Sequence, residues 1–195
     1  MACSKPNPDW LLTLSTHNSI HLWKRAKAGD RHALESLLRS HQDQIFRFCR
    51  ARLPNESMAI EATQETATRI IAGLNDFQGR SKISTWILGI ANNICHESIR
   101  KNKSWAENDS RPLDSIPDSS EPASDRLLRQ SELGKLKQAI ENLPERQNAM
   151  IVLRYFEGMS HKEIATTLAV SVGTVKATLH QAVEKLKIEF HLEDA

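Results

Sequence analysis

The sequence is poor in the residues that mark several large protein classes. Its 195 residues include three cysteines, seven glycines and one tyrosine, and aromatic residues make up 5 %. Three widely separated cysteines, an odd number, argue against a disulfide framework and favour a reducing compartment. The protein is therefore expected in the cytoplasm. Scarce glycine and tyrosine argue against an all-β fold built on many tight turns.

Long hydrophobic runs are also missing. No stretch approaches the roughly 20 apolar residues that a membrane-spanning helix needs. The first residues lack the basic start and apolar run of a secretory signal. The sequence thus predicts no membrane span of its own and no export.

Charge is small in total but unevenly distributed. The net charge is +2, yet residues 20–103 carry 14 Lys/Arg against 8 Asp/Glu, and residues 104–125 carry 1 against 6. Residues 126–195 carry 10 against 9. The acidic stretch is rich in Ser and Pro and poor in apolar residues, which is typical of a flexible linker. We therefore expect an N-terminal extension (1–19), a first domain (20–103), a linker (104–125) and a second domain (126–195).

Both predicted domains have helical periodicity, so the expected fold class is all-α. In the first domain apolar residues recur at helical spacing, with a turn expected at 28–30 and a loop around 75–79. The second domain predicts helices at about 126–141, 144–157, 161–169 and 172–190. Ser160 and Glu163 form a capping-box pattern before the third of these helices.

The last two predicted helices have the spacing of a helix-turn-helix. Ala165 is the small residue at the helix crossing, and Val175 and Leu179 would pack back onto the first helix. Ala169 stands where glycine is more usual, and Ser171 can cap the second helix. The alternative is a helical hairpin that binds nothing. Early in the second helix Lys176 is the one cation, which indicates weak autonomous DNA binding.

Residues 84–105 raise the question of a metal site. Cys95 and His96 are adjacent, so on a helix they diverge by about 100° and seldom bind one ion together. No second Cys/His pair has zinc spacing. The pattern favours Cys95 in the core, His96 at the surface and no metal site.

The chain resembles the group IV, or extracytoplasmic-function (ECF), sigma factors of bacterial RNA polymerase, within the sigma-70 family. The segments that carry the resemblance are AKAGDRHALESLL, AIEATQETATRI, FQGRSKISTWILGIANNICHESIRK and LPERQNAMIVLRYFEGMSHKEIATTLAVSVGTVK. The resemblance covers about residues 20–190. It implies a transcription initiation factor with two small helical domains, a flexible acidic linker and a helix-turn-helix in the C-terminal domain.

The resemblance also implies partners and contact residues. The first domain (region 2) would bind the clamp of the polymerase β′ subunit and open the promoter −10 element. The second (region 4) would contact the β flap and read the −35 element, and an anti-sigma factor is expected. The implied clamp contacts are Glu61, Gln64 and Glu65. The implied −10 contacts are Phe77, Gly79, Arg80, Ser81, Lys82, Asn93, Arg100 and Lys101. The implied −35 contacts are Ser171, Thr174, Lys176, Thr178, His180 and Gln181.

Three departures from the family pattern stand out. Ile60 and Glu61 replace an acidic pair in the clamp helix, and Ala67 replaces an aromatic residue. The arginines that commonly follow VGTVK are missing. Trp86 has two readings, a base-stacking ring or a core residue at a helix start, of which the core reading is favoured.

Two other functional classes are weighed against this reading. The alternative is a free-standing helix-turn-helix transcriptional regulator. An enzyme has little support, because the sequence contains no nucleophile elbow, phosphate loop or paired-carboxylate arrangement. No catalytic residue, metal or cofactor is therefore expected.

Overall fold

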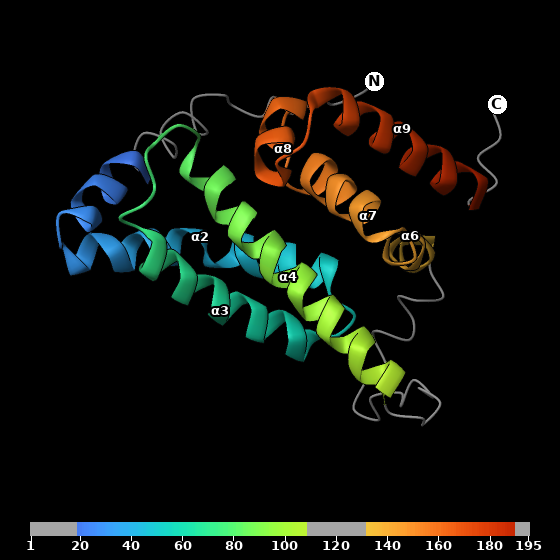
Figure 1. Cartoon of the computed structure of the whole chain (residues 1–195), viewed down its shortest axis with the longest axis horizontal. Coiled ribbons are helices and arrows are strands. Elements are labelled where there is room, and N and C mark those ends of the chain that lie inside the picture. Colours follow the sequence, from blue (N-terminus) through green and yellow to red (C-terminus); the bar gives the residue numbers. More distant parts are fainter. Residues whose placement is uncertain (1–18, 109–131, 190–195) are drawn as a thin grey trace, which may run out of the picture.

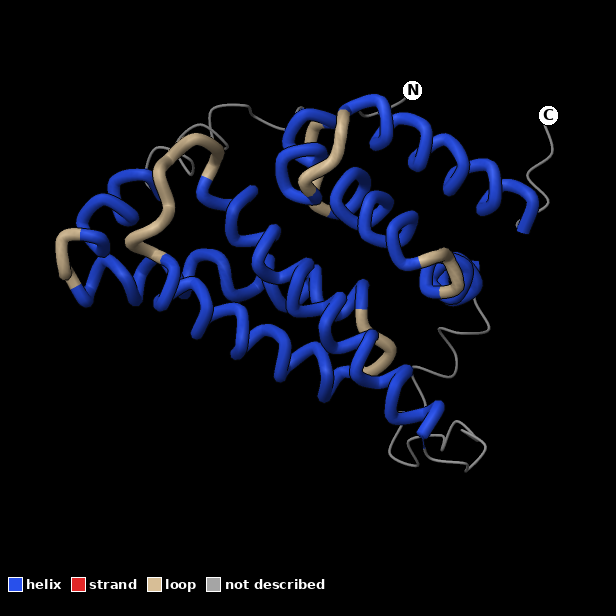
Figure 2. The backbone as a smooth tube through the Cα atoms, in the orientation of Figure 1, coloured by secondary structure: helices blue, strands red, loops and turns tan. Residues whose placement is uncertain are grey.

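The computed structural model describes residues 19–108 and 132–189, and the regular structure in this part is entirely helical (Figures 1 and 2). Residues 19–27 form a short first helix. The labelled elements that follow are α2 (Arg31–Arg52), α3 (Glu56–Gly73), α4 (Ile83–Asn108), α6 (Glu132–Glu141), α7 (Glu145–Ile151), a π-helical turn η1 (Val152–Phe156), α8 (His161–Leu168) and α9 (Val172–Glu189). Within the described ranges no helix is both long and apolar enough to cross a membrane.

The first domain is a bundle of α2, α3 and α4, which pack against one another. Polar caps set where its helices begin. The Asp30 side chain accepts a hydrogen bond from the Ala33 N–H at 3.0 Å, and Asn55 accepts one from the Met58 N–H at 2.8 Å. Such caps satisfy backbone donors that the first helical turn leaves unpaired. Asp30 is the last residue of the predicted turn at 28–30, so the start of α2 after this turn is confirmed.

The second domain contains the predicted helix-turn-helix in α8 and α9. The Ser160–Glu163 capping box is present, with Glu163 N donating to Ser160 Oγ at 3.2 Å and Ser160 N donating to the Glu163 carboxylate at 2.8 Å. Ser171 caps α9 by accepting a hydrogen bond from the Thr174 N–H at 3.0 Å. Val175 and Leu179 are buried, as the motif requires.

Three details differ from the sequence-based expectations. Helix α4 continues to Asn108, past the predicted linker start at 104, because residues 104–108 contain no glycine or proline that would end it. The predicted 144–157 helix is α7 followed by the π-helical turn η1, where Glu157 N bonds Val152 O. Pro144 is the N-cap of α7 rather than its first helical residue. Residues 1–18, 109–131 and 190–195, with most of the predicted linker and the start of the predicted 126–141 helix, lie outside the described residues.

Ala169, the residue that replaces the expected glycine, adopts a left-handed conformation with φ 51° and ψ 45°. This conformation costs a residue with a Cβ about 1–2 kcal/mol. Ala169 is exposed, so its methyl group buries little surface in return. We expect Ala169→Gly to raise the free energy of unfolding by about 1 kcal/mol after the entropy of the unfolded glycine is subtracted, as measured by urea denaturation.

Gly158 provides the control for this prediction. It has φ 66°, and an added Cβ would meet nothing within 4 Å, so Gly158→Ala changes backbone strain without a steric clash. It should lower the free energy of unfolding. A stabilising Gly158→Ala, or a neutral Ala169→Gly, would contradict the assignment of strain to these turns.

The two domains pack directly against each other in this structure. Helix α8 lies beside α4, and η1 contacts α2 (Figure 1). The buried apolar residues form one cluster that includes Ile87 of α4, Met150 of α7 and Ile164 of α8. The helices α4 and α8 approach closely at Gly89, where an added Cβ would lie 3.6 Å from the Thr167 carbonyl oxygen, an ordinary van der Waals distance that alanine would also satisfy. The composition of the linker gave no sign of this contact.

Candidate nucleic-acid interface

An aromatic stack supports the loop between α3 and α4. The Trp23 and Phe77 rings meet edge-on at 5.1 Å between centroids, and Phe77 and Trp86 lie 5.0 Å apart at a tilt of 33°. Such ring pairs stabilise by about 0.5–1.5 kcal/mol beyond their buried area. Phe77 is buried, whereas Trp86 is half-buried. The stack therefore holds the loop against the helices through the buried Phe77 ring and leaves part of Trp86 at the surface.

Residues before α2 hold the same loop by its backbone. The Lys27 ammonium donates to the Asn75 carbonyl at 2.7 Å, and Trp23 Nε1 donates to the Leu74 carbonyl at 3.5 Å. Gly79 has φ 71°, a left-handed conformation that glycine adopts without steric cost. The loop thus has a defined course on which its polar side chains are displayed.

Two hollows lie on either side of Trp86. One, of about 280 Å³, is lined by Arg69, Gly73, Asp76, Trp86, Ile90 and Asn93. The other, of about 260 Å³, is lined by Asp76, Phe77, Gln78, Arg80, Ser81 and Trp86. The shared ring of Trp86 offers an aromatic surface, and Asn93 offers an amide that both donates and accepts hydrogen bonds. This combination suits an unstacked nucleobase.

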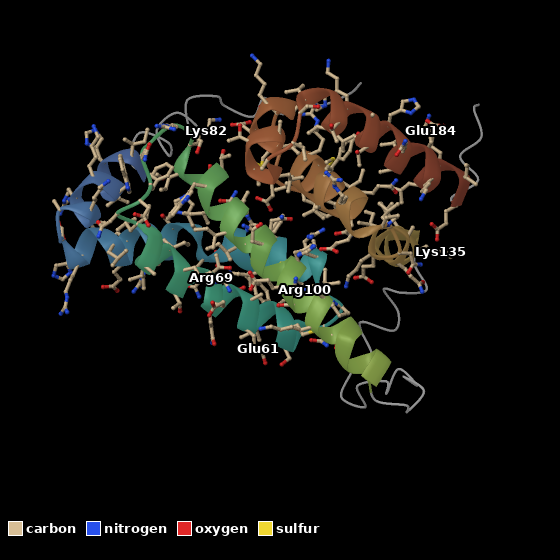
Figure 3. The ribbon with its side chains drawn as sticks, viewed as in Figure 1. Glu61, Arg69, Lys82, Arg100, Lys135 and Glu184 are labelled. Carbon is tan, nitrogen blue, oxygen red and sulfur yellow. The ribbon has the colours of Figure 1, made fainter. Side chains whose placement is uncertain are left out.

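Arg69 is oriented at the first hollow by two carboxylates. It donates to both oxygens of Glu97, at 3.0 and 2.8 Å, and to Glu65 at 2.8 Å. Figure 3 labels Arg69 on α3. The Glu97 and Glu65 contacts raise the pKa of the Arg69 guanidinium, and Arg69 in turn lowers the pKa of Glu97. The guanidinium is thus fixed and fully charged beside Asn93.

Most predicted −10 residues are accessible in this arrangement. Ser81 is half-buried, and the exposed residues are Gly79, Arg80, Lys82, Asn93, Arg100 and Lys101. Phe77 is the exception. It is 6 % exposed because its ring is used in the aromatic stack, so the direct DNA contact by Phe77 stays a prediction that this packing does not favour. Trp86 packs on Phe77, as the core reading expects, and also borders both hollows, so base stacking by its ring stays a prediction.

Lys82 is held by the second domain. Its ammonium lies 2.8 Å from the Glu163 carboxylate of α8. Partial burial raises the pKa of Glu163, but Lys82 and the Ser160 capping interactions outweigh it and lower the pKa. The charge of one predicted DNA contact, Lys82, is therefore paired across the domain contact, while Asn93 remains exposed.

The predicted clamp residues share one surface of α3. Glu61, Gln64 and Glu65 are spaced at i, i+3 and i+4, and all three are exposed. Two isoleucines on the same helix are also exposed, Ile60 at 43 % and Ile71 at 50 %. Single exposed apolar side chains are common on protein surfaces, so these two isoleucines are compatible with a partner surface but do not by themselves indicate one.

The predicted −35 residues lie along the exposed side of α9. Ser171, Lys176, His180 and Gln181 are exposed, and Thr174 and Thr178 are half-buried. The Thr174 hydroxyl lies 2.9 Å from Ser171 Oγ, so it already takes part in the cap. Farther along, Lys187 lies 3.2 Å from Glu184. Lys176 remains the cation nearest the start of this helix.

The predicted separation of Cys95 from His96 is confirmed. Cys95 is fully buried and His96 is exposed. Among the described residues no group of three or more His, Cys, Asp or Glu side chains is placed to hold a metal ion.

Sequence reasoning missed a buried polar cluster at the domain contact. Arg52, with 1 % side-chain exposure, donates to the Glu145 carbonyl at 2.8 Å and to Asn148 Oδ1 at 3.1 Å. Cys49 and Cys95 lie nearby, with their sulfurs 3.8 Å apart. The only hint of this cluster in the sequence was an arginine next to apolar residues. The sequence did not indicate which helix that arginine would contact.

Comparisons with known proteins match both halves of the chain. The family model described as Sigma-70 region 2 matches residues 37–104, and that described as Sigma-70, region 4 matches residues 133–186. The chain is 29 % identical over 172 residues to the ECF RNA polymerase sigma factor SigW of Bacillus subtilis, with 84 % of this chain and 92 % of the relative covered. It is 28 % identical over 159 residues to the ECF RNA polymerase sigma factor SigM of Mycobacterium tuberculosis, covering 82 % and 78 %.

Solved structures show the same fold at lower identity. CnrH, in complex with the cytosolic domain of CnrY, matches with a TM-score of 0.69 and 21 % identity over 91 % of this chain and 99 % of that one. The sigma factor RpoE, in complex with the anti-sigma factor NepR from Bartonella quintana, matches with a TM-score of 0.67 and 19 % identity, covering 82 % and 98 %.

Proposed function

The chain belongs to the ECF group of the sigma-70 family, and we propose on this basis that it is the promoter-specificity subunit of a bacterial RNA polymerase. It directs the core enzyme to particular promoters and starts transcription there. The observation that carries this function is the occurrence of region 2 and region 4 in one chain, in the family's order. A sigma factor needs both, because one domain opens the promoter and the other positions the enzyme.

We assign promoter opening to the surface around Trp86 and Asn93. A single-stranded −10 base would enter a hollow beside Trp86, where the ring stacks on it and the Asn93 amide reads its edge. Arg69 lines the same hollow, but its charge is balanced by Glu97 and Glu65, so we assign it to shaping the hollow and not to holding phosphate. Arg100 and Lys101, exposed farther along α4, would hold the backbone of the strand.

Polymerase binding is assigned to α3. Its exposed carboxylates and Gln64 provide polar contacts, and Ile60 and Ile71 provide the apolar surface that a stable contact needs. We place the β′ clamp on this face. The β flap is assigned to the second domain by family membership.

The −35 element is assigned to α9, with weak binding by this helix alone. Lys176 supplies one early positive charge, and each phosphate contact contributes about 0.9 to the salt slope. Useful affinity therefore arises when polymerase holds both domains on one promoter, through effective concentration. An anti-sigma factor is a further proposed partner, supported by the solved complexes of CnrH and RpoE.

Reconstitution tests the function directly. Purified protein is added to sigma-free polymerase core, and transcription is measured on a pool of promoter fragments. We expect initiation at a subset of promoters, in amounts that saturate with the added protein. A free-standing regulator would bind DNA yet restore no initiation, so absence of initiation with retained DNA binding would overturn the proposal.

A further inference from the structure

Two cysteines that lie 46 positions apart meet inside the first domain. Cys49 comes from α2 and Cys95 from α4, and their sulfurs are 3.8 Å apart. Both residues are fully buried. A disulfide requires a sulfur–sulfur distance near 2.05 Å, so the two atoms must approach by about 1.8 Å. Formation of the bond therefore requires the two side chains to rotate, or the helices to shift, by that amount.

A buried cation stands beside this pair. The Arg52 guanidinium bonds the Glu145 carbonyl and Asn148 of α7, but its Nε has no hydrogen-bond partner among the described residues. An unpaired buried donor on a charged group is costly. The charge of Arg52 acts on both sulfurs. The positive charge of Arg52 would therefore stabilise a thiolate at either cysteine.

The two thiols are not equivalent. The hydrogen bond from Cys95 lowers the pKa of Cys49, with smaller contributions from Thr63 and Arg52. The same hydrogen bond, together with burial, raises the pKa of Cys95. In this structure Cys95 Sγ donates to Cys49 Sγ, so the geometry places the thiolate at Cys49 and leaves the proton on Cys95. An attacking thiol beside a resolving thiol is the pairing of redox-sensor cysteines, and because both sulfurs are buried here, reaction requires local opening of the helix bundle.

We propose that Cys49 and Cys95 are a redox-convertible dithiol, which hydrogen peroxide oxidises to a disulfide that joins α2 to α4 beside the contact between the two domains. The oxidant is assigned by size. Both sulfurs are buried, so a water-sized peroxide reaches them through local opening more easily than a bulky disulfide does. The site goes beyond promoter recognition and does not depend on it.

The reaction balances in two steps. The Cys49 thiolate attacks one peroxide oxygen, an S–O bond forms, the O–O bond breaks, and the departing hydroxide takes a proton to become water. The Cys95 thiol then loses its proton, and its sulfur attacks the Cys49 sulfur. The S–S bond forms, the S–O bond breaks, and the second hydroxide leaves as water. The two thiols lose two electrons and two protons, and peroxide is reduced to two molecules of water.

The primary test is a peptide map of the folded protein after peroxide treatment. Cys3→Ser removes the third cysteine, which lies outside the described residues, and leaves the pair intact. In this variant we expect two free thiols to fall to none, a cross-linked peptide containing Cys49 and Cys95, and recovery of both thiols with dithiothreitol. The matched control, Cys3→Ser with Cys95→Ala, should form no intramolecular disulfide. Circular dichroism confirms that both variants are folded.

Several results would overturn the proposal. They are retention of both thiols under peroxide exposure that fully oxidises a small free thiol, over-oxidation of one cysteine without a cross-link, or intermolecular dimers in place of the intramolecular bond. In the wild-type chain, a disulfide that joins Cys3 to either partner would also overturn it.

A pH profile tests the contribution of Arg52. The charged groups around the pair are Arg52 of α2, Glu145 of α7 and His96 of α4, which lies 3.8 Å from the Glu145 carboxylate. Arg52→Met removes the charge and keeps a shorter, unbranched apolar side chain. We expect the pH at which oxidation reaches half its maximal rate to rise by about one unit or more, while Arg47→Met, an exposed change on the same helix, leaves it unchanged. An unshifted profile for Arg52→Met would show that the guanidinium does not assist the thiolate.

Discussion

Asn93→Ala lowers open-complex formation by about tenfold to a hundredfold and leaves polymerase affinity unchanged. The expected loss corresponds to about 1–3 kcal/mol for a base contact by a side-chain amide. Asn93 is exposed and makes no side-chain hydrogen bond within the described part of the chain, so its truncation should not weaken the fold. Permanganate footprinting of the −10 strand measures opening, and binding to labelled core enzyme measures polymerase affinity.

Asn102→Ala is the matched control, because Asn102 is an exposed asparagine on the same helix that lines neither hollow beside Trp86. It should open promoters normally. Asn93→Asp adds a further check, since the carboxylate keeps the shape of the amide, loses its donor and repels phosphate. Normal opening by Asn93→Ala, or an equal defect in Asn102→Ala, would remove the assignment of this pocket to the −10 base.

Arg52→Ala is expected to destabilise the protein by about 3 kcal/mol and to loosen the contact between the domains. The substitution removes two hydrogen bonds that cross from α2 to α7 and leaves Asn148 Oδ1 buried without its Arg52 donor. It also opens a cavity where the side chain was 1 % exposed. Urea denaturation followed separately in each domain is the measurement, and we expect the two transitions to separate.

Arg52→Met distinguishes the charge from the packing. Burial lowers the pKa of Arg52, which shows that desolvation opposes the charge, and the nearest carboxylate, Glu145, lies 3.8 Å away. A methionine fills much of the space without that cost, so it should destabilise less than alanine. Arg47→Ala, an exposed change on α2, should be nearly neutral. Coincident transitions in Arg52→Ala at wild-type stability would show that Arg52 does not join the domains.

Much of the local structure was determined by the sequence itself. Helical periodicity, the Ser160–Glu163 capping box and the Ala165 to Val175 spacing depend on residues a few positions apart, and each was found where the pattern predicted it. Ala169 is the clearest case. A turn that favours glycine was identified from the motif, and the left-handed alanine is what that motif demands of the residue in this position.

Only the tertiary structure decided which surfaces face each other. The burial of Phe77, the two hollows shared by Trp86, and the contact of α4 with α8 all depend on the packing of segments distant in sequence. Cys49 and Cys95 show the limit most plainly. In the sequence they are two of three scattered cysteines, and their separation of 46 residues does not indicate how far apart they lie in space. Helices α2 and α4 bring them together because their apolar faces must be buried against one another, and the same packing places Arg52 beside them.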